Sequence, residues 1–430
     1  MKELLSGNEA IARGAYEAGA VFAAAYPGTP STEILENFAL YPGVKAQWAP
    51  NEKVALEAGI GASLAGARVL VAMKHVGVNV AADPLFTLSY TGVNGGLVLV
   101  SADDPGMHSS QNEQDNRNYA RAAKLPFFEP ADSAEARDMT RLAFQLSEDF
   151  DTPVMIRTTT RISHSKSLLE LQARQAVPLK EYRKNARKYV MIPAYAAQRH
   201  RQVITRMERL REYAENTPFN RIEKGSDGGK TGVITSGIAY QYVREALPSA
   251  SILKLGLPFP FPENKVREFA AGVEKLYVVE ELGPFLEGFI KGMGLKVAGK
   301  SLFPLNGEIS AGMVAAKIAG RPLASPLQPE EYREEELPVR PPVLCPGCSH
   351  RGVFYVFKKL KLIVTGDIGC YTLACQAPLE AMDSCICMGA SIGAAAGMLQ
   401  ANPALLGRVV AVIGDSTFFH SGLTGLVDCV

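Results

Sequence analysis

This 430-residue sequence has no excess of positive or negative charge. It contains 45 lysines and arginines against 44 aspartates and glutamates, so the formal net charge is +1. This balance gives no reason to expect nucleic acid or a membrane surface as a partner. No apolar run approaches the roughly 20 residues that a membrane-spanning helix needs. The first residues, M-K-E-L-L-S-G-N-E, lack the apolar core of a signal peptide and predict a capped helix.

A disulfide framework is also unexpected. The seven cysteines are an odd number, and six of them lie between Cys345 and Cys387. Such clustering in a large chain without a leader suits metal or redox chemistry in a reducing compartment better than paired cystines. We therefore expect a globular protein of the cytoplasm. No short repeat with a fixed period is present either, which argues against a solenoid.

The chain alternates helix and strand patterns over most of its length. In residues 1–163, buried-strand patterns occur at Val21–Tyr26, Lys45–Ala49, Arg68–Met73, Gly96–Ser101 and Pro153–Thr158. Helical patterns between such strands predict right-handed crossovers and a mostly parallel sheet. Ligands gather at the carboxyl ends of strands in this architecture. The fold class expected is therefore α/β, with three consecutive mostly parallel-sheet domains.

The remaining boundaries follow from changes in composition. Residues 164–230 are rich in Arg, Lys, Glu and Gln and predict a charged helical connector with a solvated face, in preference to a basic nucleic-acid helix. A second α/β domain occupies residues 231–320. Its first strand lacks G-x-G-x-x-G, so no dinucleotide site is inferred. Residues 321–342 are a proline-rich acidic linker, and a third α/β domain begins at residue 343.

The third domain carries a motif for a diphosphate. The strand pattern Arg408–Ile413 leads into Gly414-Asp415-Ser416. The carboxylate is a hard ligand for Mg²⁺, and the glycine lets the backbone approach phosphates. Thiamine-diphosphate enzymes use this arrangement and place an Asn ligand roughly 25–30 residues later. The sequence ends at Val430, so we expect an incomplete diphosphate-binding domain. The alternative for Asp415 is a helix N-cap.

A second Gly-Asp pair lies nearby. Asp367 follows a strand pattern, and it either touches the cofactor or caps the next turn. The Gly389–Gly397 run of small residues predicts either a packed helix or a backbone that crowds a bound cofactor.

Thiamine diphosphate also requires a carboxylate that hydrogen-bonds its aminopyrimidine ring, usually from another domain. Glu52 follows the expected strand Lys45–Ala49 at the first turn of a helix, where a side chain can point into a crevice. The alternative is that Glu52 merely stabilises its helix N-terminus.

Cysteine and histidine give weaker candidates. Cys345, Cys348 and Cys370 have a spacing compatible with an iron–sulfur or zinc site, but no fourth ligand is evident, and buried or cofactor-lining thiols are the alternative. His75 and His108 fall in expected loops at the ligand edge of the first sheet. Each is a candidate catalytic proton donor or substrate contact, or a structural residue.

Taken together, these segments resemble a known family. The motifs are G-N-E-A-I-A-R-G-A-Y-E-A-G at Gly7, A-Y-P-G-T-P-S-T-E-I at Ala25, W-A-P-N-E-K-V-A-L-E at Trp48, K-H-V-G-V-N at Lys74, the Asp103–Arg117 segment, C-P-G-C-S-H-R at Cys345, G-D-I-G-C-Y-T-L at Gly366 and G-D-S-T-F-F-H-S-G at Gly414. They are similar in order and detail to the α subunits of indolepyruvate ferredoxin oxidoreductases, which are thiamine-dependent 2-oxoacid:ferredoxin oxidoreductases. The resemblance covers essentially the whole chain.

The resemblance implies a thiamine pyrimidine-binding domain, a transketolase C-terminal-like domain and a diphosphate-binding domain. It implies Glu52 as the activating carboxylate and Asp415 as the Mg²⁺ ligand. The cofactor-binding candidates are Tyr26, Thr29, Glu52, Gly366, Asp367, Gly369, Cys370, Tyr371, Gly389, Gly414, Asp415, Ser416 and Thr417.

The implied reaction is oxidative decarboxylation of an aryl pyruvate with coenzyme A and ferredoxin, giving an arylacetyl-CoA. The implied partners are a β subunit and ferredoxin, within an oligomer. Family members continue into a ferredoxin-like segment that binds [4Fe–4S] clusters, which this sequence does not contain, so we expect it to be inactive alone. The alternatives are another thiamine-dependent 2-oxoacid oxidoreductase or decarboxylase, or a truncated assembly partner without activity.

Overall fold

The computed structural model describes residues 2–323, 338 and 340–430. The chain forms two compact units, residues 1–324 and 325–430, and each is described by itself. The expected linker, residues 321–342, lies largely outside the described residues. The α/β class with mostly parallel sheets is confirmed.

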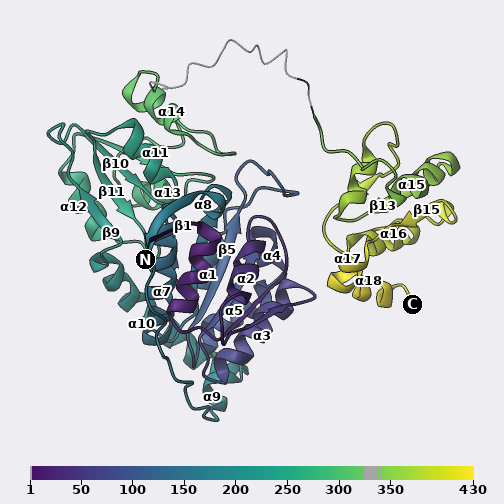
Figure 1. Ribbon diagram of the computed structural model, residues 1–430, viewed down its shortest axis with the longest axis horizontal. Coiled ribbons are helices and arrows are strands. Elements are labelled where there is room, and N and C mark those ends of the chain that lie inside the picture. The colour runs from purple at the N-terminus through teal and green to yellow at the C-terminus, as the bar shows by residue number, and fades with distance from the viewer. Residues whose placement is uncertain (1, 324–337, 339) are drawn as a thin grey trace. The chain divides into compact units, whose positions relative to one another are not determined.

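A six-stranded parallel sheet forms the centre of the first unit (Figure 1). Its spatial order is β3-β2-β4-β5-β7-β6. The strands are β2 (Phe22–Ala25), β3 (Lys45–Trp48), β4 (Val69–Lys74), β5 (Leu97–Asp103), β6 (Phe127–Phe128) and β7 (Val154–Thr159). All five strand patterns of the N-terminal part are therefore confirmed, to within a few residues at each end. All four residues of β3, the edge strand, are exposed.

Two hydrophobic cores lie on opposite faces of this sheet. Val69 and Val71 belong to one core, whereas Leu70 belongs to the other, because successive side chains of a strand point to opposite faces. Helices α3 (Glu52–Leu64) and α5 (Ala82–Thr91) cover the first face. Helices α1 (Gly7–Glu17), α2 (Thr32–Ala39) and α7 (Ser133–Asp149) cover the second (Figure 1). Short helices α4 (His75–Val80), α6 (Arg117–Ala123) and α8 (Thr160–His164) follow strand ends or loops at the edge.

The capping box predicted at the start of α1 is present. The Ser6 hydroxyl accepts a hydrogen bond from the backbone N–H of Glu9, and the Glu9 carboxylate accepts one from the N–H of Ser6. The residues just before it form β1 (Lys2–Ser6), which pairs antiparallel with β8 (Lys166–Glu170).

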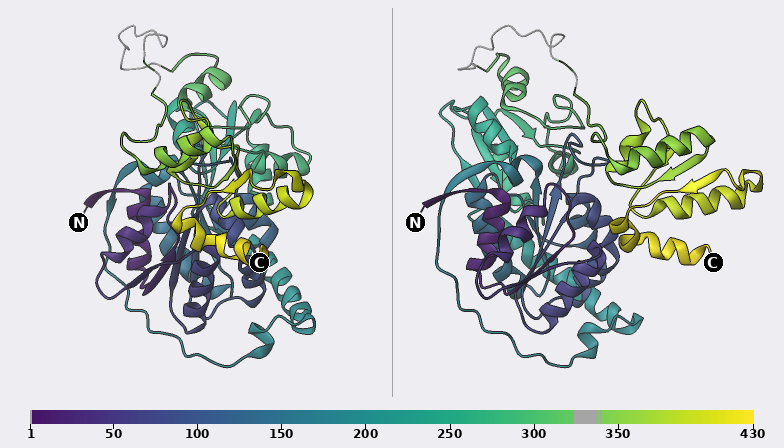
Figure 2. Two further views of the ribbon diagram at one scale, coloured as in Figure 1. Left: turned by 90° about the vertical axis from the view of Figure 1, so that its right-hand side faces the viewer. Right: turned by 45° about the vertical axis from the view of Figure 1, so that its right-hand side comes forward.

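Residues 164–230 contain a charged helix with a solvated face, as predicted, and further elements besides. They supply β8, and then an extended segment runs along the outside of the unit to the short helix α9 (Ala186–Tyr189) (Figure 2). Helix α10 (Pro193–Asn216) packs through two buried arginines. Arg199 bonds the carboxylate of Asp151, and Arg206 bonds its backbone carbonyl. The helix keeps an exposed, charged face, as predicted, but these two arginines of the charge run are buried because they bind inward-facing oxygens.

The second α/β domain belongs to the same compact unit. Its four-stranded sheet has the order β12-β10-β11-β9, with β9 antiparallel. The strands are β9 (Asn220–Glu223), β10 (Thr231–Thr235), β11 (Ser251–Leu255) and β12 (Lys275–Val279). The helices are α11 (Ala239–Ala246), α12 (Glu263–Ala271), α13 (Phe285–Gly292) and α14 (Ala311–Val314), extended by η1 (Ala315–Ala319).

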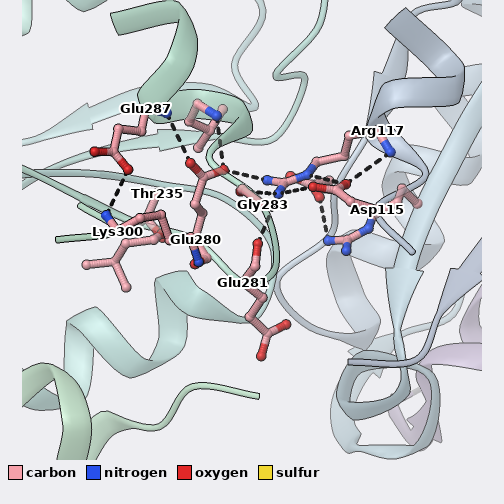
Figure 3. A network of polar contacts seen from close by, with 12 residues as sticks. Asp115, Arg117, Thr235, Glu280, Glu281, Gly283, Glu287 and Lys300 are labelled. Atoms are coloured by element: carbon pink, nitrogen blue, oxygen red, sulfur yellow. Dashed lines mark hydrogen bonds and ion pairs between the residues drawn. The ribbon is translucent and has the colours of Figure 1, made fainter. Parts of the chain in front are cut away.

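A buried ion network joins the two domains of this unit (Figure 3). Arg117, at the start of α6, is 1% exposed. Its guanidinium contacts the carboxylates of Asp115 at 2.6 Å and Glu280 at 2.7 Å, and it donates to the backbone carbonyl of Glu281 at 2.9 Å. Glu280 also accepts the N–H groups that begin α13. A charge this deeply buried requires such a complete set of partners.

A second buried arginine lies beside this network. Arg157, on β7, bonds Asp103 at 2.9 Å and Glu129 at 2.7 Å. Burial raises the pKa of Asp103 to about 6, against the opposing effect of Arg157. Burial likewise raises the pKa of Glu281 to about 7, although Arg157 opposes the shift.

The second unit is built on three parallel strands in the order β14-β13-β15. They are β13 (Ile363–Gly366), β14 (Ser384–Cys385) and β15 (Val409–Ala411). The helices are α15 (Ser349–Leu360), η3 (Cys370–Cys375), α16 (Ala390–Ala401), η4 (Pro403–Leu405), α17 (Asp415–Thr417), η5 (Phe418–Gly422) and α18 (Leu423–Asp428). Strand β15 was expected to be buried, but its residues are partly exposed. Throughout the described residues of both units, the structure contains no helix with the length and apolarity required to traverse a membrane.

Replacing Glu281 by Gln tests whether burial raises the pKa of this carboxyl group in the folded protein. The folded pKa of about 7 lies above the ordinary 4.5, so between these values the native state binds more protons than the unfolded state. The free energy of unfolding must therefore fall as pH rises through this window, by an amount on the order of 3 kcal/mol. The variant should lose this part of the pH dependence and be the more stable protein at pH 8.

Urea titrations at pH 5 and pH 8 measure this effect. Trp48 is the only tryptophan of the chain, so its fluorescence reports unfolding of the first unit. The exposed residue Glu274 gives a control, Glu274→Gln, that should keep the pH dependence of the unchanged protein. Parallel curves for Glu281→Gln and the unchanged protein would contradict the assignment.

Candidate active site

The carboxyl ends of four neighbouring strands bring polar residues to one edge of the first sheet. Tyr26 follows β2, Glu52 follows β3, His75 follows β4 and Asp104 follows β5. The pairing register places these ends side by side, because Ala25 pairs with both Trp48 and Ala72 in adjacent strands. This is the edge at which ligands bind in parallel α/β sheets.

Glu52 is the first residue of α3 and is 4% exposed. The helix is already capped by Asn51, whose side chain accepts a hydrogen bond from the N–H of Val54. The Glu52 carboxylate lies directly on Gly77 of α4. A Cβ atom at Gly77 would be 2.7 Å from both Cγ and Oε1 of Glu52. Withdrawing a carboxylate from water is costly, and stabilising a helix N-terminus does not require it. This placement favours a role for Glu52 beyond its own helix.

His75 does not lie in a loop, as the sequence suggested, but begins α4. Its side chain is fully buried, and its Nε2 atom lies 3.0 Å from the carbonyl oxygen of Asn112. Burial lowers the pKa of His75, so the ring is neutral at physiological pH. The backbone carbonyl of His75 accepts a hydrogen bond from Asn116. These contacts make His75 a well-anchored part of the edge.

The loop after β5 is organised around Asp104. Its carboxylate accepts hydrogen bonds from the N–H of Ser109, the hydroxyl of Ser110 and the hydroxyl of Thr160. Burial alone would raise the pKa of Asp104, but the hydrogen bonds from Ser110, Ser109 and Thr160 hold it below its ordinary value. Asp104 was not among the candidate site residues of the sequence. Its position directly after a buried strand was the available signal.

His108 lies on the same loop but is separated from these contacts. Its ring is 56% exposed, and Nε2 lies 3.7 Å from Glu308. An open depression of about 370 Å³ is lined by His108, Thr160, Arg161, His164, Ser165 and Glu308. The structure therefore brings His75 to the neighbourhood of Glu52, but places His108 against a loop of the second α/β domain.

The turn after β2 packs closely against Lys74, a residue that the sequence did not single out. The N–H of Gly28 donates to the hydroxyl of Thr32, and a Cβ atom at Gly28 would lie 2.9 Å from Cδ of Lys74. Glycine is needed there for this close approach. Tyr26 is buried at the strand end, whereas Thr29 is exposed on the turn.

In the second unit, Asp367 follows β13 and is fully buried. Its carboxylate accepts hydrogen bonds from the N–H of Gly389 at 2.8 and 2.9 Å, from the N–H of Ile368 at 2.9 Å and from the hydroxyl of Ser391 at 3.2 Å. Of the two roles expected for Asp367, this geometry favours the structural one, which here fixes the start of α16. Gly389 has a φ of +89°, a conformation that favours glycine.

The Gly414-Asp415 pair follows β15, as the sequence predicted. Asp415 is the first residue of α17, and Gly414 occupies the cap position, so the alternative of an Asp415 N-cap is wrong. The Asp415 carboxylate is exposed and makes no hydrogen bond or ion pair within the described part of the chain. The neighbouring N–H of Gly414 donates to the hydroxyl of Tyr371 at 3.0 Å. Asp415 is therefore available as an oxygen ligand for Mg²⁺.

The surroundings of this pair are ordered. Thr417 is buried and donates to the carbonyl of Ile368, whereas Ser416 is exposed. Burial raises the pKa of the Tyr371 hydroxyl, which therefore remains protonated. Gly369 precedes the short helix η3, which begins at Cys370 and includes Tyr371.

The cysteine set is not assembled into a metal site. Cys345 and Cys348 lie on the turn before α15, whereas Cys370 begins η3. Across residues 2–323, 338 and 340–430, no group of three or more His, Cys, Asp or Glu side chains is arranged to hold a metal ion. All seven cysteines are free thiols.

Comparison with known proteins identifies two thiamine diphosphate-binding regions in the chain. The family described as pyruvate flavodoxin/ferredoxin oxidoreductase, thiamine diphosphate-binding, matches residues 13–224. The thiamine pyrophosphate enzyme, C-terminal binding domain family matches residues 367–430. A solved 2-oxoglutarate:ferredoxin oxidoreductase from Magnetococcus marinus shares the fold with a TM-score of 0.64 at 18% identity. That alignment covers 74% of this chain and 65% of that chain, slightly under two thirds.

Relatives of higher identity extend over the whole chain. Indolepyruvate oxidoreductase subunit IorA of Archaeoglobus fulgidus is 42% identical, over 100% of this chain and 73% of its own length. The IorA subunit of Pyrococcus abyssi is also 42% identical, over 99% and 72%. The chain therefore belongs to the indolepyruvate oxidoreductase subunit IorA family, within the thiamine diphosphate-dependent 2-oxoacid oxidoreductases.

Proposed function

We propose that this chain is the catalytic α subunit of an enzyme that oxidatively decarboxylates aryl pyruvates of the indolepyruvate type. Coenzyme A would accept the acyl group and ferredoxin the electrons. The observation that carries the proposal is the buried Glu52 carboxylate, held against Gly77 at the ligand edge of a thiamine-binding family domain. The names of the IorA relatives support the substrate class.

The residues present fit thiamine diphosphate. Glu52 would hydrogen-bond the ring nitrogen of the aminopyrimidine, and its burial keeps this bond out of competition with water. In the second unit, Asp415 would hold Mg²⁺ on the diphosphate, with Gly414 and Ser416 beside it. When bound, this cofactor supplies a carbon nucleophile and an electron sink for decarboxylation.

The other edge residues have supporting roles in this proposal. The neutral ring of His75 is held by the Asn112 carbonyl, so we assign it to positioning the edge beside Glu52. Tyr26 and Thr29 would line the pyrimidine or the substrate. The exposed position of His108 gives no support for a proton donor there.

The same proposal includes a β subunit as partner and [4Fe–4S] clusters that carry electrons to ferredoxin. It also includes assembly into an oligomer in the cytoplasm. A second candidate function is oxidation of a different 2-oxo acid. It is favoured by a 2-oxoglutarate synthase subunit KorA of Archaeoglobus fulgidus, which is 28% identical over 65% of this chain. Reduction of a viologen dye by the full-length gene product with its partner subunit, measured against a panel of 2-oxo acids, decides between them.

Replacing Glu52 by Gln should lower the turnover number by roughly 100-fold or more, because an amide cannot transfer a proton to the ring nitrogen as a carboxyl group can. Cofactor affinity should change little, since the diphosphate is held elsewhere. Dye reduction and titration calorimetry measure the two quantities. Glu57→Gln, an exposed position on the same helix, is the control. Near-normal turnover of Glu52→Gln would remove Glu52 from this role.

Replacing Asp415 by Ala should abolish the Mg²⁺-dependent part of thiamine diphosphate affinity, because the hard oxygen ligand is lost. The fold of the second unit should survive, since the carboxylate has no partner among the described residues. Asp428→Ala, an exposed position of α18, is the matched control. Unchanged affinity of Asp415→Ala in calorimetry would refute the assignment.

Adding one methyl group at Gly77 should displace the Glu52 carboxylate, because the new Cβ would lie 2.7 Å from its Cγ and Oε1 atoms. We expect turnover to fall roughly tenfold to 100-fold for a misplacement of about 1 Å. Gly61→Ala serves as the control, because a Cβ at Gly61 of α3 meets no atom within 4 Å. Equal turnover of the two variants would show that this contact does not position Glu52.

A further inference from the structure

Lys74 ends β4 at the centre of the ligand edge, between the strands that lead to Tyr26 and to Asp104. Its aliphatic stem lies against Gly28 in the turn after β2, where a Cβ would come within 2.9 Å of Cδ. Its ammonium group donates to the carbonyl of Ser109 at 2.7 Å. Lys74 is thus held in one place by two loops of the edge.

The other cations near this edge are already paired with carboxylates. Arg117 contacts Asp115 and Glu280, Arg161 contacts Glu308 at 2.7 Å, and Lys53 contacts Glu57. Lys74 has no carboxylate within 4 Å among the residues that the structure describes. Asp104 is close enough to act on Lys74 electrostatically, but its oxygens are occupied by Ser109, Ser110 and Thr160.

This arrangement leaves the ammonium group with unused capacity. An ammonium group has three N–H donors, and one of them is bonded to Ser109. Burial lowers the pKa of Lys74, while Asp104 and Glu52 raise it. A partly buried cation without an ion pair gains most from an anion that replaces its lost hydration.

We propose that Lys74 binds the carboxylate of the 2-oxo acid substrate. This inference rests on the proposed function, because it names the recognition element of that same site. Lys74 lies two strands away from the strand that leads to Glu52, with β2 between them, and the helix that follows Lys74, α4, packs on Glu52 at Gly77. A carboxylate bound by Lys74 would hold the adjacent 2-oxo carbon on the side of the edge where Glu52 acts. The bond formed is an ion pair with hydrogen bonds, and no covalent step is involved.

The test compares a charged ligand with its uncharged counterpart. Indole-3-propionate and its primary amide have the same shape but differ in the charge that Lys74 would recognise. Each is used as an unreactive competitive inhibitor of dye reduction by the full-length gene product with its partner subunit. The unsubstituted enzyme should bind the carboxylate roughly 10- to 100-fold more tightly than the amide. In Lys74→Met this ratio should fall to about one.

Controls separate recognition from folding. Lys53→Met removes a neighbouring lysine that is paired with Glu57, and it should keep the ratio of the unsubstituted enzyme. Lys74→Arg, which restores the charge, should recover part of the ratio. If Lys74→Met weakens both inhibitors equally, Lys74 only supports the Ser109 loop and the proposal is overturned. An unchanged ratio overturns it as well.

The failure of the proposed function gives a different result. Turnover of the unsubstituted enzyme is measured first with indolepyruvate and with non-aryl 2-oxo acids. If only a non-aryl acid is turned over, the aryl assignment fails, and the Lys74 test is run with the saturated acid and amide of that substrate. If no 2-oxo acid is turned over, both proposals fall together. Normal turnover with an unchanged inhibitor ratio in Lys74→Met removes the Lys74 inference alone.

Discussion

Glu52 can occupy its buried position only because residue 77 has no side chain. A carboxylate at the end of a strand is usually hydrated, but here it rests on the backbone of a neighbouring helix. The same principle applies at the turn after β2, where Gly28 lets the stem of Lys74 pack against the backbone. Two missing side chains therefore bring two opposite charges to one ligand edge. The chemistry of the edge depends on this close packing.

The rest of the first unit keeps that edge in shape. The loop after β5 carries Asp104, Ser109 and Asn112, which fix the residues at the end of β4. The loop is anchored at its far end by Arg117, whose partners Asp115 and Glu280 come from both domains of the unit. The second α/β domain therefore acts on the ligand edge through a buried ion network. Five carboxylates, from Asp103, Asp115, Glu129, Glu280 and Glu281, lie around two arginines in this region, and burial raises the pKa of Asp103 to about 6 and that of Glu281 to about 7.

The sequence was informative where local pattern determines structure. Alternating buried strands and capped helices specified the first sheet, because hydrophobic periodicity and caps act within a few residues. Glu52 and Asp415 were proposed as site residues because each begins a helix shortly after a strand. Contacts between distant segments were not visible. The bond between Arg206 and Asp151 attaches one face of the charged helix to the first α/β domain, and the bonds to Asp367 favour a structural role for this residue. Lys74 was not among the candidate residues because the lack of an ion-pair partner, within the part of the chain that the structure describes, is visible only from its three-dimensional neighbours.

The pairing of β1 with β8 bears on how the protein is made. Residue 6 is matched with residue 166, so the two strands are far apart in the order of synthesis. A ribosome exposes β1 long before its partner has been translated, and during that interval the first strand has an unsatisfied backbone. The six-stranded sheet, whose strands lie between β1 and β8 in the sequence, can form while β1 is still unpaired. Pairing of β1 with β8 would then be a late step of folding, which follows the formation of the six-stranded sheet.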